Sequence, residues 1–514
     1  MTAARASRIT DALLGIAAMA AILLALTRLD AAGEGVERRA FDVAGTPATA
    51  HLPEGPALGP VLVIAHGFAG SQQLMQSFAL AAARNGYAAV TYDLAGHGRN
   101  PAPLGGSITD PEGATRRLVD QLGRVVEVAR RLGDGRVAVL GHSMASDIVV
   151  RFAQQTPGIG ATIAVSMFAP TVTETTPPNL LVIVGALETA LAAEALRAVG
   201  LAAAPGAAQM RVTHGDPAAG TARRAAASPW TEHVSVLFAQ ASLAETVGWL
   251  DLAFGIPRAG PPRTDMRGPW IVLLLAGVVA LMRPLARLLP VVSSPPAGAG
   301  LGWRALWPVI VVPAVATPLV LRVLPTKFLP VLVGDYLAMH FLAFGLIAAA
   351  CLAACGRGPI RPAPPPALSR RALVLATLGA VAFGLVGVAW PIDRLLTSFA
   401  LSPGRLTLFL ALLAGTAAHF LAAEWATRGP GAGRGGYAAM QAGFLASLIA
   451  AVALDFERLF FLLIIVPVIA IFFAIYGHAS AVLQRRTGHP FVGGIATAIA
   501  FAWAIAATFP LVEG

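Results

Sequence analysis

Two kinds of hydrophobic pattern divide the chain. Long apolar stretches occupy residues 12–27 and most of the chain from 268 onward, whereas residues 30–258 carry frequent charges, glycines and prolines. In this middle region, short β-branched runs are separated by longer segments typical of helices. The pattern predicts an N-terminal transmembrane anchor (1–29), a water-exposed domain (30–258) and a C-terminal transmembrane domain (268–514).

The middle region predicts a mostly parallel sheet. Continuous apolar strands that alternate with helices are typical of a doubly wound α/β fold, in which helices cover both faces of the sheet. Residues 38–52 predict an antiparallel hairpin at one edge. The predicted strands cover 61–65, 88–92, 137–140, 162–166 and 180–184, and the predicted helices cover about 72–85, 112–132 and 144–156.

The region from 268 onward predicts an all-α bundle of about eight transmembrane helices, because each apolar stretch is long enough to cross a bilayer. The first stretch, 12–27, is shorter and has the alternative interpretation of a cleaved signal peptide. No small-x-small cleavage site precedes Arg28, which favours a retained anchor. The predicted C-terminal spans are 269–289, 305–324, 328–354, 372–390, 406–424, 437–454, 459–480 and 491–511.

Composition agrees with membrane embedding. Hydrophobic residues make up 56% of the 514 residues and charged residues 12%, too few charges to cover a soluble protein of this size. The net charge of +10 could indicate nucleic-acid binding, but the arginines cluster between apolar segments, where they determine membrane topology. No nucleic-acid partner is therefore expected.

The arginines predict an N-terminus inside the cytoplasm and the domain 30–258 outside it. With this orientation, thirteen arginines lie inside and five basic residues lie in the short outside loops. The inside set is Arg5, Arg8, Arg283, Arg287, Arg304, Arg357, Arg361, Arg370, Arg371, Arg428, Arg434, Arg485 and Arg486, and the outside set is Arg322, Lys327, Arg394, Arg405 and Arg458.

A candidate nucleophile follows the third predicted strand of the parallel sheet. The pentapeptide Gly141-His142-Ser143-Met144-Ala145 joins that strand to a predicted helix. A strand–turn–helix context is what a nucleophile elbow requires, because the turn exposes the serine Oγ and directs the next N–H, that of Met144, into an oxyanion hole. Ala145 stands where the motif usually has a second glycine, and it is still small enough for a tight turn.

Two further loops follow strands at the same edge of the predicted sheet. The segment His66-Gly67-Phe68-Ala69-Gly70-Ser71 can supply a second oxyanion N–H, for which Phe68 is the natural donor. The segment Asp93-Leu94-Ala95-Gly96-His97-Gly98 follows the next strand. With these motifs at these intervals, residues 60–254 resemble the α/β-hydrolase superfamily, in particular its serine aminopeptidase, monoacylglycerol lipase and dienelactone hydrolase-like members.

The resemblance implies a catalytic triad in the chain order serine, acid, histidine. It implies Ser143 as nucleophile, Glu188 as acid and His233 as general base. Relatives usually have an aspartate at the position of Glu188, and Asp216 is the alternative acid. His214 is an alternative base that lies one strand too early. By the same resemblance His66, His97 and His142 are expected to pack turns and bond loop carbonyls.

These observations together predict a membrane-bound serine hydrolase that cleaves an ester, thioester or amide through an acyl-enzyme. Together with the predicted spans, the resemblance implies a location in a bacterial inner or cytoplasmic membrane and contact with membrane lipid. It also implies a small acyl or lipid-like substrate and no metal or cofactor. The alternative is a transporter or channel with an accessory or catalytically silent hydrolase-like domain. Residues 167–179 are too few for an inserted cap domain, so the transmembrane bundle is expected to cover the site.

Overall fold

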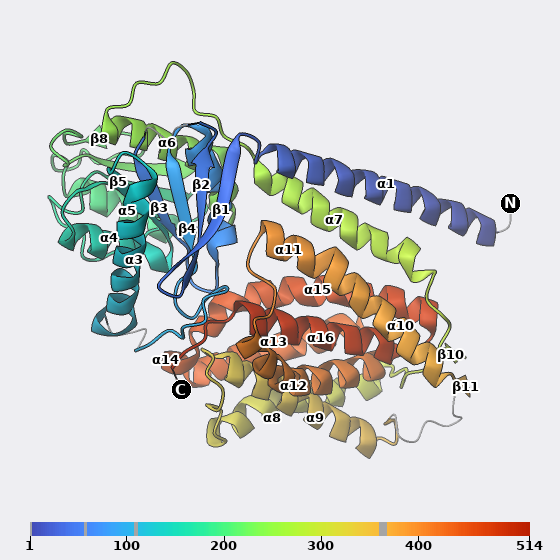
Figure 1. The fold of residues 1–514 in the computed structure, drawn as a ribbon. Helices are drawn as coiled ribbons and strands as arrows, with labels where there is room; N and C mark the ends of the chain where they lie inside the picture. The colour runs from blue at the N-terminus through green and yellow to red at the C-terminus, as the bar shows by residue number, and fades with distance from the viewer. Residues whose placement is uncertain (1–2, 56–58, 107–110, 359–366, 514) are drawn as a thin grey trace.

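The computed structural model describes residues 3–55, 59–106, 111–358 and 367–513. An α/β domain lies against one end of a helical bundle (Figure 1). Arg361, one of the arginines counted above, lies outside the described residues.

The α/β domain is built on a nine-stranded mixed sheet with the order β1-β2-β4-β3-β5-β6-β7-β9-β8. The central strands β4, β3, β5, β6, β7 and β9 are parallel, while the hairpin β1–β2 and the edge strand β8 are antiparallel to their neighbours. This confirms the doubly wound fold and the edge hairpin. The strands are β1 Val36–Val43, β2 Thr46–Pro53, β3 Val61–Ala65, β4 Ala88–Tyr92, β5 Val137–His142, β6 Ile159–Val165, β7 Leu180–Gly185, β8 Thr213–His214 and β9 Arg223–Ser228.

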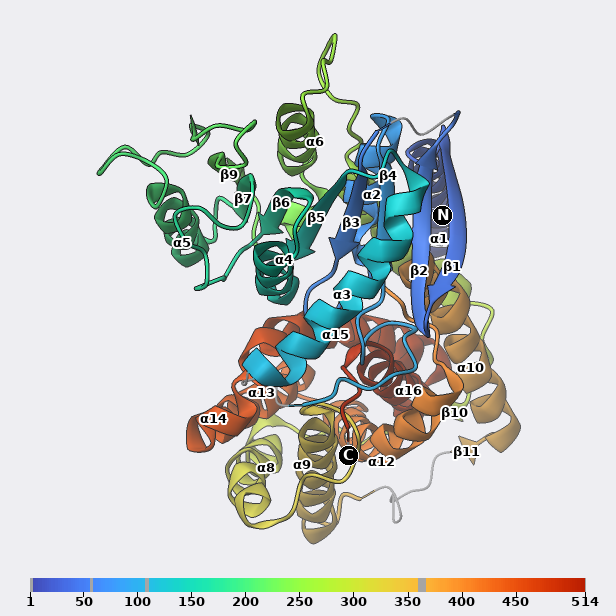
Figure 2. The same ribbon diagram turned by 60° about the vertical axis from the view of Figure 1, so that its left-hand side comes forward.

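Helices cover both faces of the sheet because the buried strands are apolar on both sides. Along β3, Val61 and Val63 pack with α3 (Arg116–Ala129) and α4 (Met144–Gln155), which lie on the near side in Figure 2. Leu62 points to the opposite face, where it packs with α2 (Gln76–Arg84) and α6 (Gln240–Phe254). The sequence did not predict α5 (Thr189–Gly200), β8 or β9.

Nine helices of the described residues are long and apolar enough to cross a membrane, as the sequence predicted. Several span boundaries differ from the prediction by a few residues, and two of the differences lie near the α/β domain. The third C-terminal span begins at Gly334 rather than 328, because Val333 has φ 50° and ends the preceding turn. The spans are α1 Ala3–Ala31, α7 Arg267–Ala286, α8 Trp303–Val323, α9 Gly334–Ala354, α10 Arg370–Phe383 continued by η5 Gly384–Ala389 and α11 Trp390–Leu395, α12 Pro403–Thr427, α13 Gly436–Leu454, α15 Phe461–Thr487 and α16 Pro490–Thr508.

The second difference is that residues 509–513 do not belong to a span, because they pair with the α/β domain. The Leu104 N–H donates to the Leu511 carbonyl at 2.8 Å, and Leu511 donates back to the Gly96 carbonyl at 2.8 Å. Arg405, buried near the start of α12, also donates to the Gly96 carbonyl at 2.8 Å. The loop that carries Gly96 is therefore bonded directly to the bundle.

All the contacts named between the α/β domain and the bundle lie at the same end of the spans. Ser398, in the segment between α11 and α12, donates its N–H to Ser71 Oγ at 2.7 Å, and Asp393 forms an ion pair with Arg99 at 2.6 Å. These segments are the ones predicted to lie outside. Their helices carry the arginine-rich linkers at their opposite ends, away from the α/β domain.

Candidate active site

Ser143 occupies a strained turn between β5 and α4. Its backbone has φ 53° and ψ −116°, a conformation that side-chain-bearing residues rarely adopt and that is typical of a nucleophile elbow. Gly141 is required two residues earlier, because a Cβ there would collide with the Ala145 carbonyl oxygen. Ala145 itself is fully buried without such a conflict, which explains how it replaces the second glycine of the motif.

His233 links Ser143 to Glu188. Its Nε2 lies 2.8 Å from Ser143 Oγ, and its Nδ1 lies 2.6 Å from Glu188 Oε1. A carboxylate facing Nδ1 favours the tautomer with the proton on Nδ1, which leaves Nε2 free to accept the serine proton. The three side chains are thus ordered for proton transfer from Ser143 to His233.

The Glu188 carboxylate is held by three donors. Besides the bond to His233, its Oε2 accepts the Gly185 N–H at 2.7 Å and the Ser166 hydroxyl at 2.8 Å. Burial alone would raise the pKa of Glu188, but these hydrogen bonds together hold the pKa below its ordinary value. The carboxylate therefore stays charged next to the imidazole.

Neither alternative from the sequence contacts His233 in the structure. Asp216 lies in an exposed turn between β8 and β9, where its Oδ1 accepts the Ala218 N–H at 2.9 Å. His214 lies in the edge strand β8 and pairs with Arg223 of β9. The structure thus brings together Ser143, His233 and Glu188 and leaves the other two outside.

The loop after β3 approaches the serine closely. A Cβ on Gly67 would lie 3.1 Å from Ser143 Cβ, so only glycine lets the backbone pass at this distance. The next residue is Phe68, the first oxyanion donor predicted from the sequence. The second, Met144, is the first residue of α4, and the N–H of a first helical residue has no acceptor within the helix. Both N–H groups thus belong to segments that contact or adjoin Ser143.

Three buried histidines connect the loops around the serine. His66 Nε2 accepts the Leu94 N–H at 3.1 Å and its Nδ1 lies 2.8 Å from the Gly67 carbonyl, so it joins the loops after β3 and β4. His97 bonds the Ala95 carbonyl at 2.9 Å, and His142 bonds the His233 carbonyl at 3.0 Å. Burial lowers the pKa of His66 to about 4, and the pKa values of His97 and His142 to about 3, so all three are neutral scaffolding.

Two serines support the site although the sequence analysis did not single them out. Ser166 bonds the acid, and Ser146 donates to the Ser143 carbonyl at 2.6 Å while accepting the Phe168 N–H at 3.2 Å. Ser166 directly follows β6, at the same edge as the other site residues. A small polar residue immediately after a buried strand was the available signal.

The site has an exposed apolar border. Four exposed side chains follow the strand ends or adjoin His233, and residues 166–179 between β6 and β7 contain no helix. Trp230 is 91% exposed. The next residue, Thr231, accepts the Leu187 N–H on its carbonyl at 3.0 Å, so Leu187 lies close to Trp230 in the fold. The apolar border consists of Phe168, Leu187, Trp230 and Val234.

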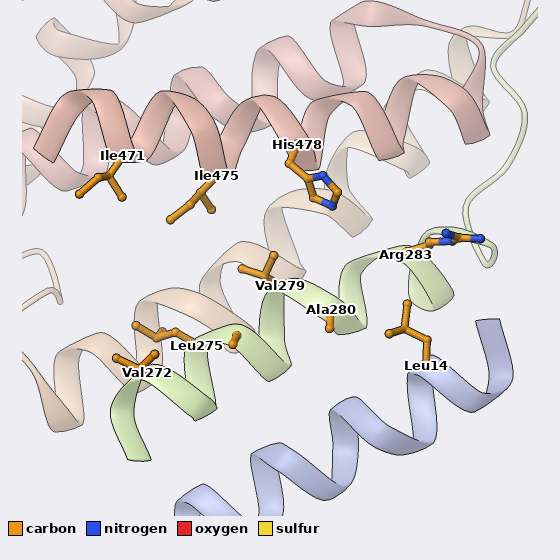
Figure 3. Close-up of a pocket in the computed structure, with 10 residues that line it drawn as sticks. Leu14, Val272, Leu275, Val279, Ala280, Arg283, Ile471, Ile475 and His478 are labelled. Carbon is orange, nitrogen blue, oxygen red and sulfur yellow. The ribbon is translucent and has the colours of Figure 1, made fainter. Parts of the chain in front are cut away.

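A separate cavity of about 700 Å³ lies between α1, α7 and α15 (Figure 3). Its walls are apolar apart from Arg283 and His478, and none of its lining residues comes from the α/β domain. It holds no pair of nucleophile and base, so it is not the reaction site. Within the described residues, no group of three or more His, Cys, Asp or Glu could hold a metal ion.

Comparison with known proteins identifies the α/β domain. A family model described as serine aminopeptidase, S33, matches residues 58–215. No curated relative matches the chain. Similar solved structures include an epoxide hydrolase from Vigna radiata (26% identity, TM-score 0.22), an epoxide hydrolase from an endophytic Streptomyces (26%, 0.22) and a protein from Thermus thermophilus (20%, 0.31).

The coverage of these matches is partial. The epoxide hydrolases match 27% of this chain, which spans only 40% and 39% of their own lengths, whereas the Thermus protein matches 42% of this chain over 98% of its length. TM-scores this low carry no structural argument, so the matched family model and the sheet order identify the fold. Residues 36–254 therefore have the α/β-hydrolase fold, and residues 58–215 within them match the serine aminopeptidase family model.

Proposed function

We propose that the chain is a membrane-bound serine hydrolase that cleaves an ester, thioester or amide bond at the extracytoplasmic face of the membrane. The observation that carries this proposal is the continuous chain of hydrogen bonds from Ser143 Oγ through His233 to Glu188, at 2.8 and 2.6 Å. A catalytically silent domain has no need to keep the strained serine and both partners in this geometry.

The proposed reaction has two steps. Ser143 Oγ attacks the carbonyl carbon while its proton passes to His233 Nε2, and His233 then gives that proton to the leaving group as the scissile bond breaks. The acyl group remains on Ser143. Water, deprotonated by His233, attacks this acyl-enzyme and releases a carboxylic acid. The N–H groups of Phe68 and Met144 stabilise the oxyanion of both steps, and Glu188 stabilises the imidazolium.

Labelling with a fluorophosphonate probe tests the proposal directly. The full-length protein in detergent should become labelled, and Ser143→Ala should lose all labelling and esterase activity. Ser235→Ala is the matched control, because Ser235 lies two residues after His233 and its hydroxyl accepts the Glu232 N–H within its own turn. An unlabelled wild-type protein, or a labelled Ser143→Ala variant, would favour a silent domain attached to a transporter-like bundle.

A further inference from the structure

Two of the three helices that border the membrane cavity, α7 and α15, contact segments that adjoin the candidate active site. α7 begins beside the turn that follows His233, since a Cβ on Gly268 would lie 3.0 Å from the Cβ of Phe238 in η4 (Ser235–Phe238). α15 begins at Phe461, whose ring stacks on Phe68 with 4.9 Å between ring centroids. α7 therefore contacts the segment that follows the base in the chain, and α15 contacts the oxyanion loop.

The cavity between these helices is apolar over most of its length. Val272 and Arg283 are eleven positions apart in the sequence, which corresponds to roughly 16 Å along the helix. This length is about half of the ~30 Å hydrocarbon core of a bilayer. Figure 3 shows that α7 and α15 diverge towards the end that carries Val272 and Ile471. Arg283 and His478 lie at the other end. The polar residues of the cavity thus lie at one end and only apolar residues line the other.

An apolar strip on α15 runs from the cavity to Phe461, the ring that stacks on Phe68 of the oxyanion loop. Its members recur every three or four residues and so share one helix face. At its outer end, Phe460 lies 4.1 Å from Phe461 between ring centroids, and Phe456 lies 6.3 Å from Phe460. Leu459 and Leu462 of the same turns are buried instead. The strip consists of Ile475, Ile471, Val468 and Ile464, which are exposed, and Phe461, which is half-buried.

We propose that this strip and the cavity bind the acyl chain of a membrane-borne substrate, an inference that rests on the proposed function. The substrate carbonyl lies at Ser143, and its chain runs past Phe68 and Phe461 into the cleft between α7 and α15. A hydrocarbon chain fits because the lining of the cavity is apolar apart from Arg283 and His478. A lipid acyl chain can slide into a cleft between two spans from the bilayer, so the substrate never leaves the membrane completely.

Filling the cleft tests the path. Ala276 lines it and is exposed, so Ala276→Trp places a large side chain where the acyl chain would lie. Ala414→Trp is the matched control, because Ala414 is an exposed residue of α12 away from the cavity. The full-length variants are reconstituted in phosphatidylcholine vesicles and assayed on p-nitrophenyl palmitate in the bilayer and p-nitrophenyl acetate in water.

Ala276→Trp should lower the ratio of palmitate to acetate turnover by roughly tenfold, and Ala414→Trp should leave that ratio unchanged. An unchanged ratio in Ala276→Trp would overturn the proposed path. If Ala276→Trp also loses fluorophosphonate labelling, its fold is damaged and Ala276→Leu takes its place. An unlabelled wild-type protein would instead remove the proposed function, so the two failures are distinguishable.

A second pair of matched variants tests the outer end of the proposed path. Phe461→Ala removes the ring that stacks on Phe68, whereas Phe328→Ala removes an exposed phenylalanine from another segment at the same end of the bundle. Phe461→Ala should lower the palmitate-to-acetate ratio and Phe328→Ala should not. Equal ratios in the two variants would contradict a role for Phe461 in guiding the chain.

Discussion

At the scale of single residues, hydrogen bonds distinguish Glu188 from the alternative acid, Asp216. Glu188 stands where relatives usually have aspartate, and its longer side chain reaches His233 while its second oxygen bonds Gly185 and Ser166. The family resemblance predicted Glu188 as the acid, with Asp216 as the alternative. The sequence alone could not choose between them, because no pattern in the chain shows which carboxylate faces the imidazole. In the structure Glu188 bonds His233, whereas Asp216 bonds the Ala218 N–H of its own turn.

Glu188→Gln should therefore be far more harmful than Asp216→Asn. An amide can donate to Nδ1 and select the wrong tautomer, and in a serine protease triad such a change costs about 10⁴-fold in kcat. We expect a loss of about 10³–10⁴-fold in kcat on a soluble ester for Glu188→Gln, and no change for Asp216→Asn. The reverse order would assign the acid to Asp216.

The buried histidines predict an acid-sensitive hydrolase domain. Burial lowers the pKa of His51 to about 3, as it does for His97 and His142. In the unfolded chain such a histidine binds a proton as the pH falls below about 6.5, whereas in the folded chain it stays neutral. The free energy of unfolding is therefore greatest above pH 6.5 and decreases as the pH falls towards the folded pKa. Each such histidine removes up to about 1.4 kcal/mol per pH unit across that window.

His51 offers a test away from the catalytic serine, because its ring bonds only Thr91 of the neighbouring strand at 3.4 Å. The temperature at which half of the fluorophosphonate labelling is lost should fall between pH 6.5 and pH 4.5. In His51→Gln the fall should be shallower. A slope equal to that of the wild type would show that His51 does not release its proton on folding.

At the scale of elements, the predictable parts are those with a strong apolar pattern. The strands VLVIA and AAVTY match β3 and β4 residue for residue, because a strand buried on both faces needs a continuous apolar run. β9 has the sequence RRAAAS, which has low strand propensity, and its position between β7 and β8 makes it a strand. Its Arg223 is buried and donates to the Pro177 carbonyl at 2.7 Å, a contact no sequence pattern shows.

One buried acid of α1 forms ion pairs at the end of α7, in addition to the apolar contacts between the two helices. Asp11 forms ion pairs with Arg283, at 2.7 Å, and with Arg287. Both arginines are partly exposed, so the loss on removing the acid is smaller than for a fully buried pair.

We expect Asp11→Asn to lower the temperature at which detergent-solubilised protein aggregates by several degrees, whereas Asp30→Asn, which removes an exposed pair with Arg394, should have little effect. Equal effects would mean that the Asp11 pairs do not hold the two helices together.

At the scale of the whole molecule, the arginine bias and the domain contacts agree on one arrangement. The segments predicted outside contact the hydrolase domain, and the arginine-rich linkers lie at the opposite ends of the spans. The sequence located the domain and its motifs, but it could not show which bundle residues bond the site loops. Those contacts join residues more than 300 positions apart, such as Gly96 and Arg405.

This arrangement predicts the labelling pattern of single cysteines in intact cells. Cys351 and Cys355 are first replaced by alanine, and exposed positions on each side are then used: Glu127 on α3 and Arg371 on α10. Glu127→Cys should react with a membrane-impermeant thiol reagent and Arg371→Cys should react only after the cells are permeabilised. The opposite pattern would place the hydrolase domain in the cytoplasm.

The bonds from Arg405 and Leu511 to Gly96 also bear on how the protein is made. A ribosome completes residues 36–254 well before these two partners, and at about 5–20 residues per second the delay is on the order of tens of seconds. During that time Gly96 lacks its hydrogen bonds from Leu511 and Arg405, and Leu104 lacks its bonds with Leu511 and Glu513. A newly made hydrolase domain is therefore unfinished until α12 and α16 have been inserted, which links the maturation of the enzyme to correct assembly in the membrane.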